Sequence, residues 1–143
     1  MLNADSIKEH AKHLQQRIDD LKSFQHLSPE KFYSDSVVRA AVERHFQVAI
    51  ECCLDIAKHV ITRKGITPPE EMKEVFNTLA KANYLDPEYA KQMTEVAKLR
   101  NILVHVYMVV DPEKIYRYLH EDIHLLEEFF SFSIGLLEDE NDS

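Results

Sequence analysis

Residues 38–60 read VRAAVERHFQVAIECCLDIAKHV, with apolar residues three or four positions apart. This spacing places them on one face of an α-helix. The row consists of Val38, Ala41, Val48, Cys52, Ile56 and Val60, with His45 in the same register. Similar rows predict helices near residues 7–21, 72–79, 89–103 and 119–137. The sequence therefore predicts an all-α bundle of four main helices and one shorter element.

The composition agrees with an all-helical chain and excludes several other classes. A chain of 143 residues is long enough to bury a core as one domain. It contains only two glycines, whereas sheet turns and phosphate-binding loops depend on glycine. The net charge of −8 argues against non-specific coating of nucleic acid, although a local basic groove could still bind RNA.

Prolines mark the expected helix starts. Each follows a capping residue and precedes an acidic residue, the arrangement that favours a first helical turn. The capping residues are Ser28, Thr67, Asp86 and Asp111. Thr67 and Glu70 also have capping-box spacing, and Gly65 is expected to end the helix that begins near Val38. Short connections between the helices predict antiparallel neighbours, and surplus apolar residues predict a second buried face.

The expected domain covers residues 1–137, and an acidic, flexible tail is expected over residues 138–143. Cys52 and Cys53 are adjacent on a helix, where a bridge between them is geometrically poor, so we expect buried, reduced thiols. The N-terminal residues are polar, and no stretch approaches the apolar length of a membrane span. These features predict a cytoplasmic protein without membrane contact.

Residues 98–110 read KLRNILVHVYMVV and place Arg100, His105 and Tyr107 in an aliphatic segment. On a continuous helix Arg100 and His105 would point about 140° apart, so they can share a face only if the helix ends or bends there. Arginine binds phosphate with a bidentate fork, and histidine transfers protons near neutral pH. Because RNA supplies its own 2′-hydroxyl nucleophile, such a pair could cleave RNA without a metal. The spacing alone is a weak signal.

Residues 100–107 resemble the Arg-x4-His-x-Tyr signature of HepT-type HEPN ribonuclease toxins, and residues 42–57 are similar to that family's second helix. The resemblance covers about residues 3–137. It implies a HEPN-like bundle of four to five antiparallel helices that forms a homodimer. It also implies the toxin of a type VII-like HepT/MntA toxin–antitoxin system. Such a toxin is a metal-independent endoribonuclease that leaves a 2′,3′-cyclic phosphate.

The resemblance also implies a role for each motif residue. Arg100 and His105 correspond to the catalytic residues, and Asn101 to a supporting residue. Tyr107 corresponds to the tyrosine that a nucleotidyltransferase antitoxin modifies with AMP. The implied partners are a second copy of the chain, that antitoxin and an RNA substrate, with no cofactor and no metal. AMP on Tyr107 would bring a negative charge beside Arg100, where it would compete with the RNA phosphate.

Structural interpretations of the same residues stay open. His105 could cap a helix end, Arg100 could be a C-terminal helix cation, and Tyr107 could be a packed core ring. Two other functions are also open. One is a non-catalytic helical module that docks a nucleotidyltransferase or binds its nucleotide. The other is a helical interaction protein in which the motif is coincidental.

Other polar residues are weaker candidates. Glu51 and Asp55 share a helix face and could hold Arg100 by an interhelical salt bridge, although an ordinary surface role is favoured. Two histidine pairs have chelating spacing but no third ligand, so solvated helix faces are expected. These pairs are His10 with His13 and His120 with His124. Three cations could hold RNA or merely complement a helix dipole. They are Lys58, Arg63 and Lys64.

Overall fold

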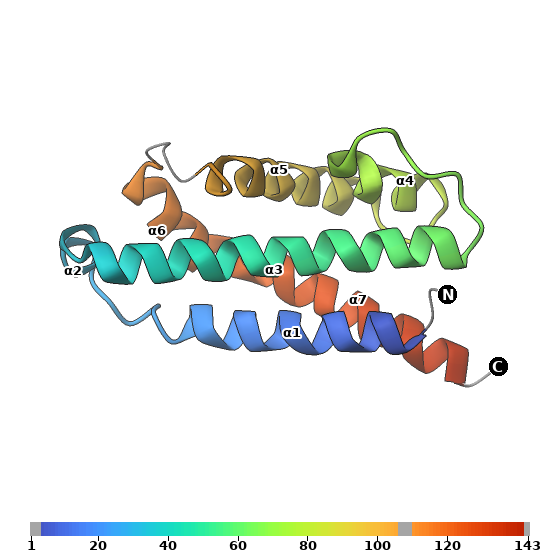
Figure 1. Ribbon diagram of the computed structural model, residues 1–143, viewed down its shortest axis with the longest axis horizontal. Helices are drawn as coiled ribbons and strands as arrows, with labels where there is room; N and C mark the ends of the chain where they lie inside the picture. The colour runs from blue at the N-terminus through green and yellow to red at the C-terminus, as the bar shows by residue number, and fades with distance from the viewer. Residues whose placement is uncertain (1–3, 106–109, 142–143) are drawn as a thin grey trace.

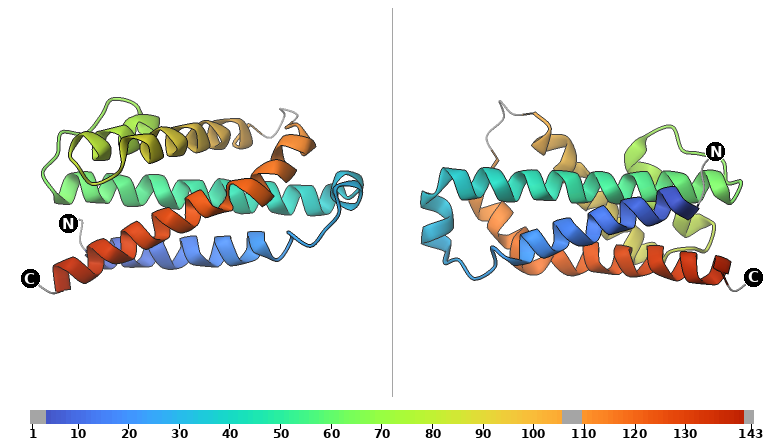
Figure 2. Two further views of the ribbon diagram at one scale, coloured as in Figure 1. Left: turned by 180° about the vertical axis from the view of Figure 1, so that it is seen from behind. Right: turned by 60° about the horizontal axis from the view of Figure 1, so that its bottom comes forward.

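The computed structural model describes residues 4–105 and 110–141, and their four long helices pack as an antiparallel bundle (Figure 1). These helices are α1 (Ala4–Lys22), α3 (Ser36–Arg63), α5 (Pro87–Leu103) and α7 (Ile123–Asn141). Helix α3 spans the molecule and packs against both α1 and α5. Helix α7 crosses behind α3 in the view of Figure 1, and Figure 2 shows it running beside α1. The all-α fold class and the antiparallel packing predicted from the sequence are confirmed.

Shorter helices connect the four long ones. They are α2 (Pro29–Ser34), the 3-10 helix η1 (Met72–Glu74), α4 (Val75–Lys81) and α6 (Pro112–Glu121). Helix α6 packs on α2, and both α4 and η1 pack on α5. The described residues thus form more helices than the four main helices and one shorter element that were predicted.

Three of the predicted caps are present. Ser28 accepts a hydrogen bond from the Lys31 amide at the start of α2. The Asp86 and Asp111 side chains likewise accept hydrogen bonds from first-turn amides of α5 and α6, and each of these helices has a proline in its first turn. Gly65 has a φ of +68° and directly follows the last turn of α3, where glycine is favoured. These local signals fix where α5 and α6 begin, and the motif lies between those two starts.

The predicted helix start at Thr67 is wrong. No helix begins there, and the chain remains irregular until η1 starts at Met72. The physical reason is the second proline: Pro69 disfavours the helical conformation at Pro68, the residue before it. The capping-box spacing of Thr67 and Glu70 is therefore not used.

The single helix expected near residues 119–137 is divided into α6 and α7. The break falls at Asp122, whose amide hydrogen-bonds to the Tyr118 carbonyl at 3.0 Å and closes α6. Helix α7 then continues to Asn141, past the boundary expected at residue 137. Helical structure thus extends into the segment that was expected to be a flexible tail.

The core lies between the four long helices. Phe76 and Phe129 meet edge to face, with ring centroids 5.5 Å apart. The Tyr89 hydroxyl donates a buried hydrogen bond to the Leu125 carbonyl at 2.7 Å and joins α5 to α7. Other fully buried side chains include Leu14, Ile18, Phe46, Ile50 and Met93. Among the described helices, none is both long enough and apolar enough to cross a membrane.

Candidate functional site

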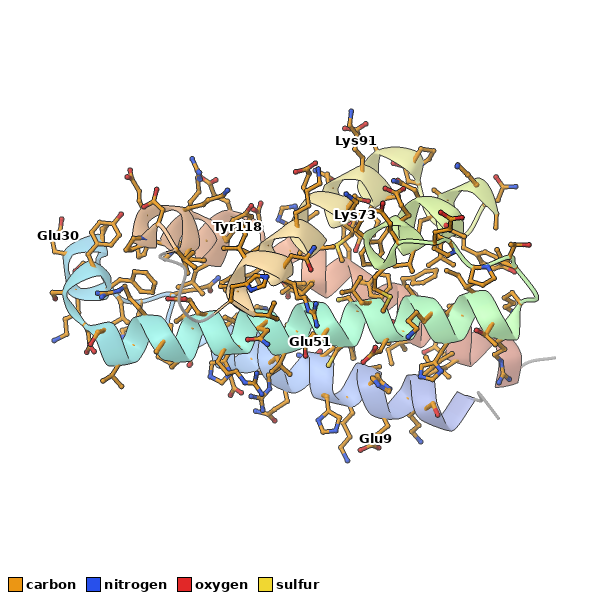
Figure 3. All side chains as sticks on the ribbon, turned by 45° about the horizontal axis from the view of Figure 1, so that its top comes forward. Glu9, Glu30, Glu51, Lys73, Lys91 and Tyr118 are labelled. Atoms are coloured by element: carbon orange, nitrogen blue, oxygen red, sulfur yellow. The ribbon has the colours of Figure 1, made fainter. Side chains whose placement is uncertain are left out.

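Arg100 lies in the last turn of α5 and contacts α3. Its Nε donates a hydrogen bond to Glu51 Oε1 at 3.3 Å, and both side chains are about one-third exposed (35% and 34%). Figure 3 shows Glu51 on the side of α3 that faces the end of α5. The surface role favoured for Glu51 from the sequence is therefore wrong, because this carboxylate holds the motif arginine across two helices.

Neighbouring amides extend this contact into a row of hydrogen bonds. Gln47 Nε2 donates to Glu51 Oε1 at 3.1 Å, one turn earlier on α3. On the other side, Arg100 Nη1 reaches Asn101 Oδ1 at 3.5 Å. Asp55, the other carboxylate considered for Arg100, lies 3.5 Å from His10 Nε2 instead. The row from Gln47 to Asn101 therefore orients the guanidinium from one side.

The end of α5 separates Arg100 from His105. The helix closes at Leu103, and the His105 amide donates to the Ile102 carbonyl at 3.2 Å in a tighter turn. The His105 side chain is exposed. A helix that ends between the two residues is the condition under which they can share a face. Tyr107, the tyrosine of the motif, lies outside the described residues.

The Arg100 side chain borders two small pockets. One, of about 270 Å³, lies on the Glu51 side, and the other, of about 170 Å³, lies on the Asn101 side. Met72 of η1 lines both pockets and is 40% exposed. Lys73, labelled in Figure 3, lines the smaller pocket and also pairs with Glu71 at 3.3 Å. The guanidinium is thus held on one side and open on another.

The cysteines next to Glu51 are poor candidates for a nucleophile. Both are buried and unpaired, as predicted. Burial, together with the nearby Asp55 and Glu51 carboxylates, raises the pKa of Cys52 to about 11. Burial also raises the pKa of Cys53 well above its ordinary value. Because the thiolate is the reactive form, neither cysteine is activated at neutral pH.

The histidine pairs lie on helices, and none of the four rings lines the Arg100 pockets. His13 faces Glu9 on its own helix, with 3.6 Å between Nε2 and Oε1. His124 is exposed, and His120 lies within 2.9 Å of two backbone carbonyls, those of Tyr116 and Gln25. Within residues 4–105 and 110–141, no three or more His, Cys, Asp and Glu side chains are arranged to hold a metal ion. The three cations Lys58, Arg63 and Lys64 are exposed near the C-terminal end of α3.

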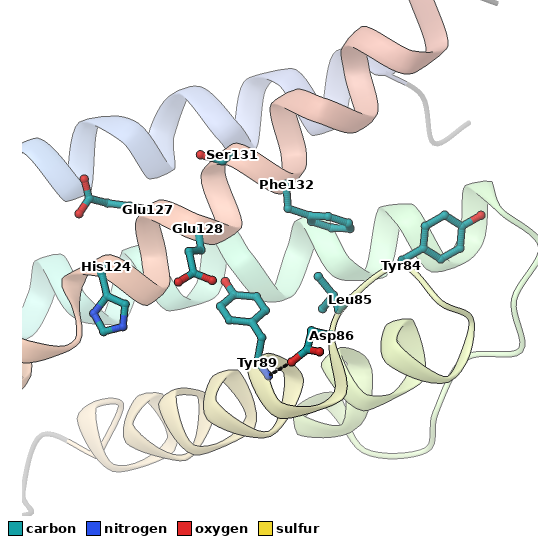
Figure 4. Close-up of a pocket in the computed structure, with 9 residues that line it drawn as sticks. All are labelled: Tyr84, Leu85, Asp86, Tyr89, His124, Glu127, Glu128, Ser131 and Phe132. Carbon is teal, nitrogen blue, oxygen red and sulfur yellow. Dashed lines mark hydrogen bonds between the residues drawn. The ribbon is translucent and has the colours of Figure 1, made fainter.

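A larger hollow, of about 710 Å³, lies between the start of α5 and α7 (Figure 4). Aromatic and acidic side chains line it together, and none of them lines the Arg100 pockets. The acidic ones are Asp86, Glu127 and Glu128. Carboxylates repel phosphate, so this hollow is not suited to a nucleic-acid backbone. The Arg100 region is the better candidate for phosphate chemistry.

Comparison with solved structures shows that a HEPN toxin has the same helical fold as this chain. A structure of the tri-AMPylated Shewanella oneidensis HEPN toxin in complex with MNT antitoxin superposes with a TM-score of 0.84. The match covers 92% of this chain and 98% of that chain, at 21% sequence identity.

Sequence comparison identifies the family. The family described as Ribonuclease HepT-like matches residues 14–132, so the chain belongs to the HepT-like family. It is 31% identical over 99 residues to the tRNA nuclease HepT of Aphanizomenon flos-aquae, covering 69% of this chain and 67% of that protein. It is 28% identical over 102 residues to the mRNA nuclease HepT of Shewanella oneidensis, covering 71% of this chain and 74% of that protein.

Sequence reasoning did not single out Gln47 or Met72. Gln47 lies one helical turn before Glu51, and this spacing is a signal that could have been read. Met72 gave no such signal, because its place beside Arg100 depends on how the irregular segment before η1 folds back onto α5.

Proposed function

We propose that this chain is the ribonuclease toxin of a HepT/MntA-type toxin–antitoxin pair, and that Arg100 and His105 cleave RNA. The observation that carries the proposal is the end of α5. There Arg100 is fixed by Glu51 but still lines open pockets, and the helix stops just before an exposed His105. Membership of the HepT-like family and two relatives named as nucleases support it.

In the proposed reaction the 2′-oxygen of RNA attacks the adjacent phosphorus while the bond from phosphorus to the 5′-oxygen breaks. A 2′,3′-cyclic phosphate and a free 5′-hydroxyl result. His105 accepts the 2′-hydroxyl proton or delivers a proton to the leaving 5′-oxygen. Arg100 donates hydrogen bonds to the phosphate oxygens as negative charge develops on them. In a homodimer, two His105 side chains would supply one base and one acid at a shared cleft.

Neutralisation would use Tyr107, two residues beyond His105. The solved Shewanella oneidensis toxin carries three AMP groups and is bound to its MNT antitoxin. We propose that a nucleotidyltransferase antitoxin likewise transfers AMP to the Tyr107 hydroxyl of this chain. The added phosphodiester would compete with RNA for Arg100 through its negative charge. Toxin, antitoxin and RNA would then all meet in the cytoplasm.

The test is cleavage of a defined single-stranded RNA in excess EDTA by the full chain and by its His105→Ala variant. Mass spectrometry first establishes that neither protein carries AMP, because a modified enzyme would be silent. We expect the unmodified chain to release fragments with 2′,3′-cyclic ends and the variant to release none. If neither protein cuts while both remain folded, the non-catalytic partner module becomes the better account. Cleavage that EDTA abolishes would refute metal independence.

A further inference from the structure

One face of α3 continues past the Glu51–Arg100 contact toward the start of the helix. Ser36, Ala40, Arg44 and Gln47 follow one another at helical spacing and lead to Glu51. The stretch before Glu51 lines a pocket of about 360 Å³ that is closed on the far side by Leu103 of α5. We call this pocket the α3 groove. The α3 groove and the pocket on the Glu51 side of Arg100 lie along successive segments of the same face of α3.

The α3 groove carries a net positive charge on a chain of net charge −8. Arg39 and Arg44 line it, and Glu43 is its one lining carboxylate. Arg39 is tethered, because its guanidinium donates to the Tyr33 carbonyl at the end of α2. Arg44 is exposed and forms no ion pair with any residue in the described part of the chain. Arg44 is thus the cation of the groove that is placed to meet an anion from solution.

The groove also adjoins the motif. Its far wall is Leu103, the last residue of α5 and two positions before His105. Its near wall includes Gln47, which hydrogen-bonds to Glu51, the partner of Arg100. Arg44 and Glu51 are seven residues apart, which corresponds to about 10 Å along the helix axis. An anion in the groove would lie close to a phosphate bound at Arg100, as neighbouring phosphates of one strand do.

We propose that the α3 groove binds a backbone phosphate of single-stranded RNA next to the scissile phosphate, with Arg44 as its principal ligand. This inference rests on the proposed function of Arg100 and His105. An RNA phosphate is favoured over the carboxylate of a protein partner. An RNA strand bound at Arg100 must continue across the protein surface on one side of the site. The positive wall of Arg39 and Arg44 attracts it, whereas the acidic hollow between α5 and α7 repels it.

The experiment measures binding rather than cleavage, so it stands apart from the test of catalysis. The full chain with His105→Ala binds a fluorescent single-stranded RNA, and Kd is measured across a range of salt concentrations. We expect Arg44→Gln to weaken binding about tenfold, as loss of one charge-assisted contact does. Losing one phosphate contact should also lower the slope of log Kd against log salt by about 0.7. Arg44→Lys should restore most of the slope.

Lys12→Gln is the control, because it removes one positive charge from an exposed position on α1 that lines neither the α3 groove nor the Arg100 pockets. We expect it to leave the salt slope unchanged. Equal losses for Arg44→Gln and Lys12→Gln would overturn the proposal in favour of a general charge effect. Unchanged RNA binding by Arg44→Gln, with loss of binding to a nucleotidyltransferase antitoxin, would overturn it in favour of a protein interface. Circular dichroism confirms that each variant is folded.

The two proposals fail in different ways. If the chain with an intact His105 cuts no RNA, the catalytic proposal fails. If Arg44→Gln nevertheless lowers the affinity for RNA and the salt slope, the proposal that the α3 groove binds RNA is upheld. If the chain cuts RNA but Arg44→Gln binds as the parent does, the catalytic proposal stands and the groove fails. A parent protein that binds no RNA at any salt concentration overturns both.

Discussion

Removal of the Glu51 carboxylate should reduce RNA cleavage far more than it reduces stability. In the structure, this carboxylate is the group that holds Arg100 Nε, at 3.3 Å, and it is itself held by Gln47. Glu51→Ala removes both hydrogen bonds and leaves the guanidinium free to turn toward solvent. If Arg100 acts on the phosphate in the transition state, its loss of orientation should lower kcat rather than raise KM.

The effect on stability can be bounded. Two unit charges about 4 Å apart attract by about 4 kcal/mol at an effective dielectric constant near 20. Both side chains are about one-third exposed (35% and 34%), so water screens the pair and competes for it. Measured pairs of this kind contribute about 1 kcal/mol or less. Complete loss of a charge-stabilising donor costs about 100- to 1000-fold in kcat, so a misoriented Arg100 should cost about tenfold or more.

The assay compares kcat and KM for the parent, Glu51→Ala and Glu51→Gln on one RNA, together with thermal melts. Glu51→Gln keeps an acceptor oxygen, so we expect it to fall between the other two. Glu127→Ala is the control, because Glu127 pairs with Lys22 between α1 and α7 at 2.7 Å, in a similarly exposed pair. It should leave kcat unchanged. A Glu51→Ala enzyme with parental kcat would refute the reasoning, as would an equal loss in Glu127→Ala.

Four further substitutions test the fold. Tyr89→Phe should destabilise the chain by about 1 kcal/mol and lower Tm by a few degrees in a thermal melt, because it removes the buried bond to the Leu125 carbonyl. Asp86→Ala should cost about 1 kcal/mol in urea unfolding through loss of the α5 cap, whereas Thr67→Ala should cost nothing, since no helix begins there. Burial holds the pKa of His59 below its ordinary value of 6.5. The neutral ring therefore stabilises the fold above that value, and this stability is lost as pH falls through the lowered pKa. The Tm of the parent should accordingly drop more between about pH 7.5 and about pH 5 than the Tm of His59→Gln, and equal drops would show that His59 is not responsible.

Local signals predicted the long helices and most of their boundaries. Asp86 and Asp111 cap helices as the sequence predicts, because a capping side chain needs only the next few residues of its own chain. Thr67 shows the limit of such signals, since one more proline changes the backbone that the same capping pattern can adopt. The break at Asp122 was missed because the apolar row continues across it, so periodicity alone gave no sign of two helices.

The site was predicted in part, and the missing part is tertiary. The motif predicted Arg100 and His105, and the break after Leu103 is where an Arg–His pair needs the helix to end. The partner of Arg100 could not be chosen, because Glu51 and Asp55 share one face of α3. Only the rotation and offset of α3 against α5 bring Glu51 to the guanidinium and Asp55 to His10. The proposed roles of the motif residues and of Tyr107 stay predictions.

The position of Arg100 implies that the same side chain can stabilise the fold and serve the proposed function. A cation in the last turn of a helix is favoured by the helix dipole, and Glu51 adds a paired carboxylate. Active-site charges are often destabilising, so that their removal stabilises the protein. Here Arg100→Ala should instead remove the cation that pairs with Glu51, and so lower both activity and Tm. Arg100→Lys keeps the charge and loses the bidentate fork, so it isolates the geometry of phosphate binding from the stability of the helix end.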